Sequence, residues 1–251
     1  MWYVGGFDPG YGGGKMVLMT RDGVRTAVVP SIVGMGDTAV GRLGIGNVGR
    51  RRRRRLLDRV VVDGVGYLVG DGTERYAAPM EAMDFLRLRG GPAVQALFYD
   101  CTYRVLGPGR HDLALLVGLP VEVMADDRNA SVTLDTLRDW MVASHRYRVN
   151  GDEVVLRVRR VNAMAQPVGA FFAWGLDNEG RWTRGADALD AGTGVLDVGF
   201  NTLDLFAVGG AELARRYTDG DTLGMRRAAE YLIKAVGGPT GRDSRCTKPT
   251  R

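Results

Sequence analysis

The sequence predicts an α/β fold in which two similar halves face each other, and three observations support this prediction. A glycine-rich stretch, Gly6–Lys15, joins two short apolar runs of β-prone residues near the N-terminus. The same pattern returns about 190 residues later in Gly194–Val208, where an aspartate again follows an apolar run. Between the two, Leu113–Leu119 is a continuous apolar run of the kind found in buried parallel strands.

The first glycine-rich stretch has the chemistry of a phosphate-binding hairpin. Its glycines leave bare backbone N–H groups, and concave sets of such groups bind phosphate. Asp8 at the end of the first run could hold a metal-bound water, and Lys15 could neutralise a phosphate. The stretch is not a P-loop, because Met16 replaces the required Ser or Thr and a strand follows instead of a helix. A glycine-rich hairpin without a ligand is the alternative interpretation.

Local signals predict the remaining elements in order. A strand at Val24–Val29 ends at Pro30, and Ser31–Gly49 is predicted to be a loop. Asp-Gly and Asn-Gly pairs predict hairpins at 60–69 and 147–161. Helices are predicted at 80–88 and 93–106, with Pro79 and Pro92 near their starts. Apolar periodicity predicts further helices at 131–144 (with Ser131 as N-cap), 166–176 and 221–236. After the turn at Gly209-Gly210, residues 211–217 are predicted to be the third strand of the second half.

Composition restricts the class of protein. The chain has 251 residues, of which 45% are hydrophobic and 25% are charged, as in soluble globular proteins. No apolar run approaches the ~20 residues of a membrane span, so no membrane partner is expected. Two cysteines are too few for a disulfide framework or a zinc site. With no recognisable signal peptide, the predicted location is the cytoplasm.

The basic charge of the chain is concentrated in one segment. Lys and Arg number 34 against 29 Asp and Glu, and the six consecutive arginines Arg50–Arg55 exceed this difference of +5. Arginine neutralises phosphates and releases counterions, so direct contact with nucleic acid is one interpretation. A solvated loop is the other, since runs of like charge repel one another and are often solvated tails.

The ordered motifs resemble those of a known superfamily. GFDPGYGGGK and DVGFNTLD resemble the two phosphate motifs of the actin-like ATPases, especially the plasmid-partitioning (ParM-like) actins and their archaeal relatives. This resemblance implies an actin-like, ribonuclease H-like α/β fold. It implies domain I at residues 1–192, with an outer-lobe insertion at about 31–78, and the start of domain II at 193–236. Residues 237–251 lack periodicity and are predicted to be a disordered tail.

The resemblance also implies ATP and Mg²⁺ as cofactors and assigns roles to residues. By resemblance Asp8 and Asp197 organise metal-bound waters, and Gln166 orients the water that attacks the γ-phosphate. These three residues are the predicted catalytic group. The predicted nucleotide-binding residues are Gly10, Tyr11, Gly12, Gly13 and Lys15 in the first hairpin and Gly199, Phe200, Asn201 and Thr202 in the second.

The implied function is nucleotide-dependent filament formation in plasmid or DNA segregation, with self-association and a DNA-binding adaptor as partners. Relatives continue beyond residue 236 into an adenosine-binding part, so the chain is expected to be truncated or divergent. ATP hydrolysis is then expected only if the site forms without that part. Two alternatives remain: a kinase or chaperone-type ATPase on the same fold, and a non-catalytic remnant that binds partners through Arg50–Arg55.

Overall fold

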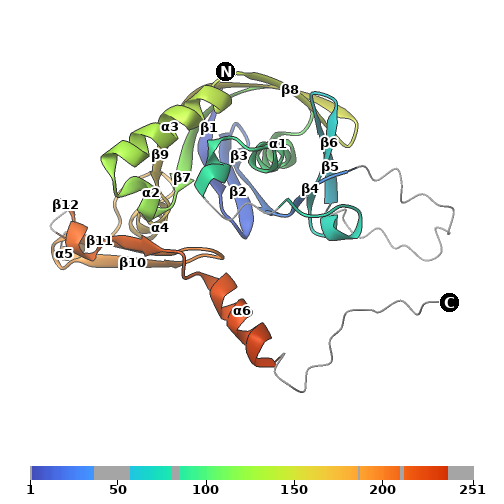
Figure 1. Cartoon of the computed structure of the whole chain (residues 1–251). Coiled ribbons are helices and arrows are strands. Elements are labelled where there is room, and N and C mark those ends of the chain that lie inside the picture. The colour runs from blue at the N-terminus through green and yellow to red at the C-terminus, as the bar shows by residue number, and fades with distance from the viewer. Residues whose placement is uncertain (1, 37–56, 81–84, 186, 210–211, 237–251) are drawn as a thin grey trace, which may run out of the picture.

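The computed structural model describes residues 2–36, 57–80, 85–185, 187–209 and 212–236. Nine strands within these residues form one mixed sheet in the order β3-β2-β1-β7-β9-β8-β5-β6-β4 (Figure 1). The strands are β1 (Tyr3–Pro9), β2 (Gly13–Thr20), β3 (Gly23–Pro30), β4 (Val33–Met35), β5 (Leu57–Val62), β6 (Val65–Gly70), β7 (Gly109–Leu119), β8 (Ser144–Val149) and β9 (Asp152–Ala165).

The centre of this sheet is parallel and brings three chain segments to one edge. β1 pairs in parallel with β7, and β7 pairs in parallel with β9. The carboxyl ends of parallel strands lie at the same edge of a sheet, and this edge is where ligands bind in open α/β sheets. β1 reaches this edge at Pro9, β7 at Leu119 and β9 at Ala165. The β5–β6 and β8–β9 hairpins have the predicted two-residue turns, with positive φ at Asp63 and Asn150.

The main core lies between this sheet and two helices, α1 (Pro92–Leu106) and α3 (Asp127–Met141). α1 packs on β2 and β3, and its buried Phe98 meets Trp140 of α3 edge to face. β2 alternates as a half-buried strand should, with Met16 and Leu18 fully buried while Lys15 is exposed. The apolar period of two therefore directs Lys15 away from the core.

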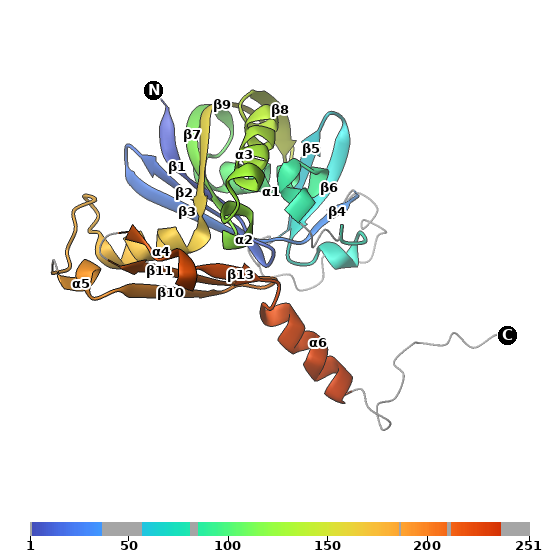
Figure 2. The ribbon, with the colours of Figure 1, turned by 60° about the vertical axis from the view of Figure 1, so that its left-hand side comes forward.

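A second, smaller sheet lies below the first (Figure 2). Its strands β10 (Thr193–Val198), β11 (Leu203–Gly209), β12 (Glu212–Leu213) and β13 (Asp219–Asp221) pair antiparallel. α4 (Gln166–Gly175) packs on β10 and β11, where Phe171, Phe206 and Val208 form a separate buried cluster. α2 (Val121–Met124) and α5 (Asp187–Asp190) are short, and α6 (Met225–Val236) extends away from the body.

Several element boundaries differ from the prediction. α3 begins at Asp127 because the side chain of Asp126 accepts a hydrogen bond from the Arg128 backbone N–H at 3.2 Å. The predicted N-cap Ser131 therefore lies inside the helix, and Ser144 instead begins β8. α6 begins at Met225 instead of at Asp221, which belongs to β13.

Two further segments are more irregular than predicted. Within the described residues the predicted helix at 80–88 is a 3-10 helix, Phe85–Arg89. The predicted third strand at 211–217 is a two-residue strand, β12, followed by a 3-10 turn, Arg215–Tyr217. The loop predicted at 31–49 contains β4. The arginine run Arg50–Arg55 and residues 237–251 lie outside the described residues. No described helix has the length and apolar character needed to span a membrane.

A buried ionic cluster joins α1 to β5. Arg104 donates to Asp100 at 2.9 Å and pairs with Asp58 at 2.7 Å. Asp58 also accepts a hydrogen bond from the side chain of Asn150 at 2.6 Å, which ties the β8–β9 turn into the cluster. Asp100 is fully buried. Burial raises the pKa of Asp100 from its ordinary 3.8 to about 8, although the Arg104 charge opposes this shift.

This shift predicts that stability falls as pH rises. Between pH 3.8 and about 8 the unfolded Asp100 carboxyl is ionised while the native one keeps its proton. The free energy of unfolding should therefore drop by up to about 1.4 kcal/mol per pH unit in this window. Asp100→Asn should remove this slope in urea unfolding measured from pH 5 to 8. Asp112→Asn, in the partly exposed Arg159–Asp112 pair, should keep it. Equal slopes in the two variants would contradict the shift.

Candidate functional site

Three of the predicted site residues meet at the carboxyl edge of the main sheet. Lys15 of β2 stands opposite Asp8 of β1, and its Nζ lies 3.0 Å from Asp8 Oδ2. Gln166, the first residue of α4, donates from Nε2 to Asp8 Oδ1 at 2.6 Å. Both oxygens of the Asp8 carboxylate are thus held by predicted site residues, one of which lies 158 positions away in the sequence.

The parallel strands explain this meeting. β1 and β9 flank β7, so the chain leaving β9 enters α4 beside the end of β1. Gly118 of β7 lies between the two side chains. A Cβ at Gly118 would come within 3.1 Å of Gln166 Cγ and 3.8 Å of Asp8 Cβ. The absence of a side chain at Gly118 therefore leaves the room that the Asp8–Gln166 hydrogen bond occupies.

The charge of Lys15 is also influenced by an aspartate of the second hairpin. The Asp8 carboxylate raises the pKa of Lys15, partial burial opposes this, and the more distant Asp197 carboxylate raises it further. Asp197 lies on β10, opposite Asp204 of β11. The two predicted catalytic aspartates, one from each hairpin, thus act on the same ammonium group.

The connection between β1 and β2 is restrained by hydrogen bonds from Ser31, the residue that follows β3. Ser31 Oγ donates to the Gly10 carbonyl oxygen at 2.5 Å, and the Ser31 backbone N–H donates to the Gly12 carbonyl oxygen at 3.3 Å. The turn is tight, since a Cβ at Gly10 would lie 2.7 Å from the Gly13 carbonyl oxygen. Only glycine fits there without a shift of the backbone.

The tips of the two hairpins touch each other. A Cβ at Gly12 would lie 3.0 Å from Phe200 Cβ, which is closer than nearly all real Cβ contacts. Gly12 belongs to the first hairpin and Phe200 to the second, so glycine-rich backbone and Phe200 pack directly together. The tips of the two predicted nucleotide-binding hairpins are therefore direct neighbours at this point.

The second hairpin turn is fixed by the start of α6. The backbone N–H groups of Gly224, Met225 and Arg226 donate to the carbonyl oxygens of Asn201, Gly199 and Phe200 at 3.1, 3.0 and 2.8 Å. The Arg226 guanidinium also donates to Asn201 Oδ1 at 3.1 Å. Asn201 and Thr202 are buried. Their side chains thus lie within the protein, where Asn201 contributes to the shape of the turn.

Two residues near the site were missed by the sequence reasoning. Asp204 is almost fully buried, and its Oδ1 accepts a hydrogen bond from the Val121 N–H at 2.9 Å, which joins the second sheet to α2. Burial raises the pKa of Asp204. The signal for Asp204 was present as a lone charge in the apolar run 203–208. Arg87 contacts the first hairpin tip from 77 positions away, and no local pattern indicated this.

The residues present fit a magnesium–nucleotide complex. No group of three or more His, Cys, Asp or Glu side chains that could hold a metal by themselves occurs in the described part of the chain. Mg²⁺ does not need such a cage, because it keeps several waters and binds through one or two carboxylates together with substrate phosphates. Asp8, Asp197 and Lys15, beside glycine-rich backbone, supply the carboxylates and the cation that this mode requires.

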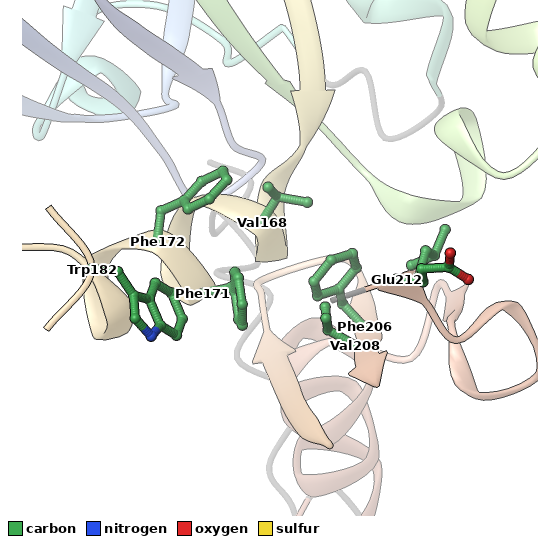
Figure 3. A pocket seen from close by; sticks show the side chains of 8 residues that line it. Val168, Phe171, Phe172, Trp182, Phe206, Val208 and Glu212 are labelled. Carbon is green, nitrogen blue, oxygen red and sulfur yellow. The ribbon is translucent and has the colours of Figure 1, made fainter. Parts of the chain in front are cut away.

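A pocket elsewhere in the molecule is chemically different from this site. It has a volume of about 340 Å³ and lies between α4 and the second sheet (Figure 3). Phe171, Phe206 and Trp182 point into it, and Glu212 is the one charged side chain among the described residues that line it. An apolar wall of this kind does not suit phosphate groups, so we place the candidate site at the hairpins.

Comparisons with known proteins agree with this architecture. The family model described as "Actin like proteins N terminal domain" matches residues 6–169. No curated protein matches the chain in sequence. The apo ParM protein of psk41 superposes with a TM-score of 0.67 at 16% identity, over 94% of this chain and 71% of that protein.

Two further solved structures are also similar. The archaeal actin homolog Ta0583 in complex with ADP has a TM-score of 0.64 at 18% identity, over 96% of this chain and 67% of that protein. AlfA from a Bacillus subtilis plasmid, solved as a filament, has a TM-score of 0.56 at 13% identity, over 92% of this chain and 78% of that protein. At these identities the likeness establishes the fold.

Proposed function

Because the chain belongs to the actin-like proteins, whose N-terminal domain matches residues 6–169, we propose that it binds Mg-ATP between its two hairpins and hydrolyses it. The observation that carries this proposal is the Asp8 carboxylate, held by Lys15 at 3.0 Å and by Gln166 at 2.6 Å. A cation, a carboxylate and a water-orienting amide converge there beside glycine-rich backbone. An ADP complex of a protein with the same fold supports nucleotide as the ligand.

We assign the residues as follows. Lys15 contacts phosphate, and the backbone N–H groups of the two hairpins grip the phosphate oxygens. Asp8 and Asp197 hold metal-bound water. Gln166 orients the attacking water, and its hydrogen bond to Asp8 keeps its amide at the edge of the site. The remaining proposed contacts come from Gly10, Tyr11, Gly12 and Gly13 in the first hairpin and Gly199, Phe200, Asn201 and Thr202 in the second.

This division of labour suits phosphoryl transfer, in which catalysis is mostly positioning and charge stabilisation. Bound Mg²⁺ would supply charge neutralisation for the phosphate oxygens. The protein's own part is to hold Gln166 and Lys15 in place on either side of Asp8. Both are held by elements of the main sheet, since Lys15 lies on β2 and Gln166 directly follows β9.

We further propose that nucleotide binding drives self-association into filaments that serve plasmid or DNA segregation in the cytoplasm, with residues 1–192 acting as domain I and 193–236 as the start of domain II. AlfA, a plasmid-encoded protein of this fold, was solved as a filament. α6 supports association, because its apolar side chains Tyr231, Leu232 and Ile233 are all more than 60% exposed. A DNA-binding adaptor would then supply the link to cargo.

Equilibrium binding of Mg-ATP to the purified chain tests the nucleotide site. Lys15→Ala should weaken binding by about tenfold or more, because it removes the cation nearest the phosphates. Arg25→Ala is the matched control, since Arg25 is also an exposed cation paired with an aspartate at 3.0 Å, on β3. Asp197→Ala should leave binding measurable and abolish turnover. Unchanged affinity and unchanged turnover in both site variants would refute the assignment.

A further inference from the structure

Arg87 reaches the tip of the first hairpin from outside both phosphate motifs. It lies in the 3-10 helix Phe85–Arg89, and its Nη2 lies 3.2 Å from the Pro9 carbonyl oxygen and 3.4 Å from that of Gly10, donating to both. Its guanidinium also stacks on the Tyr11 ring, 4.6 Å from the centroid. The three partners are consecutive residues, of which Pro9 ends β1 and Gly10 and Tyr11 begin the β1–β2 connection. Arg87 therefore contacts the segment whose N–H groups are proposed to face phosphate.

The Arg87 guanidinium is a largely buried charge. Burial lowers its pKa, and the nearby Tyr11 and Asp8 groups oppose this lowering. Burying a charge is costly unless hydrogen bonds compensate, and the two carbonyl oxygens and the aromatic ring are such compensation. Lysine would not replace these contacts, because an ammonium lacks the planar face that stacks and the fixed fork of donors.

The carbonyl contacts have a consequence for the N–H groups. In a trans peptide the C=O of one residue and the N–H of the next lie in one plane and point in opposite directions. Holding the Pro9 and Gly10 carbonyls therefore orients the N–H groups of Gly10 and Tyr11. Ser31 does the same for the peptide between Gly12 and Gly13 through the Gly12 carbonyl. The restraints on one side of the turn thus set the direction of its donors on the other.

We propose that Arg87 is a positioning residue that clamps the carbonyl oxygens of the first hairpin so that its N–H groups are preorganised for nucleotide phosphate. This proposal rests on the proposed function. Preorganised donors lose little freedom when they bind an anion, so removing the clamp costs affinity even when the fold survives. The positive charge of Arg87 adds attraction for phosphate, and a variant that keeps the charge separates the two effects.

The full chain carrying Arg87→Met, Arg87→Lys or Arg89→Met tests the clamp with two measurements. Arg89 is the matched control, because it is an exposed arginine on the same 3-10 helix. Hydrogen exchange without nucleotide should be about tenfold faster at residues 10–14 in Arg87→Met than in Arg89→Met. Titration calorimetry should give about tenfold weaker Mg-ATP binding for Arg87→Met. Arg87→Lys should recover part of the affinity but not the slow exchange.

Each outcome decides one question. Unchanged exchange at residues 10–14 overturns the clamp, even if the chain binds Mg-ATP. Faster exchange with unchanged Mg-ATP affinity overturns the positioning role and leaves a purely structural contact. A folded wild-type chain that does not bind Mg-ATP overturns the proposed function and with it the role toward phosphate, while the exchange result still reports the clamp. If Arg87→Met does not fold, Arg87→Lys against Arg89→Lys supplies the same comparison.

Discussion

Asp8→Ala is expected to lower the rate of ATP hydrolysis by about 10³-fold, the upper range for loss of one preorganised polar group in an active site. The Asp8 carboxylate contacts two other proposed site residues at once, with Lys15 at 3.0 Å and Gln166 at 2.6 Å. Its removal deletes the proposed acceptor for metal-bound water, leaves Lys15 without this counter-charge and frees the Gln166 amide to turn. Three proposed functions are lost with one side chain.

Phosphate release at saturating Mg-ATP measures this effect. Asp22→Ala is the control, because Asp22 also pairs with a cation at 3.0 Å but is highly exposed and sits at the far end of the β2–β3 hairpin. It should keep the wild-type rate within about twofold, since exposed ion pairs contribute little. Asp8→Asn offers a finer comparison, because it retains an oxygen for Gln166 and loses only the charge. A rate for Asp8→Ala close to that of Asp22→Ala would remove Asp8 from the reaction.

Local patterns were sufficient for most of the strands and turns. The hairpins at Asp63-Gly64 and Asn150-Gly151 were predictable because two-residue turns need positive φ, which Asn, Asp and Gly tolerate. The exposure of Lys15 follows from the alternation along β2 in the same way. The start of α3 was missed because Asp126 and Ser131 are equally good caps by residue type, and only the chain path selects Asp126.

The assembly of the site required information that local patterns do not contain. Asp8 and Gln166 meet because β1, β7 and β9 are neighbours in a parallel sheet, and no spacing in the sequence encodes that order. The resemblance to actin-like ATPases suggested Gln166, and the geometry now places it against Asp8. Arg87 had no such support, since it lies in a short 3-10 helix that neither a motif nor the resemblance marks as part of a site. Asp204 was visible as a charge within an apolar strand, but its partner on α2 was not.

The second large effect concerns the core beneath the first hairpin. Phe98→Ala is expected to lower the free energy of unfolding by about 3–5 kcal/mol, the usual cost of removing a buried phenyl ring. Phe98 has no exposed surface, and its ring centroid lies 5.2 Å from Phe7, 5.6 Å from Tyr99 and 5.9 Å from Trp140. The cavity would thus open between β1, α1 and α3, where few neighbours can move to fill it.

Urea unfolding with an unchanged m-value measures this loss, and Phe172→Ala is the matched control. Phe172 is the same residue type on a helix but is 45% exposed, so its removal should cost less than about 1 kcal/mol. Phe7 immediately precedes Asp8, so the cavity should also weaken Mg-ATP binding by loosening the support of the first hairpin. A loss of stability no larger than that of Phe172→Ala would show that α1 does not anchor the sheet edge on which the proposed site depends.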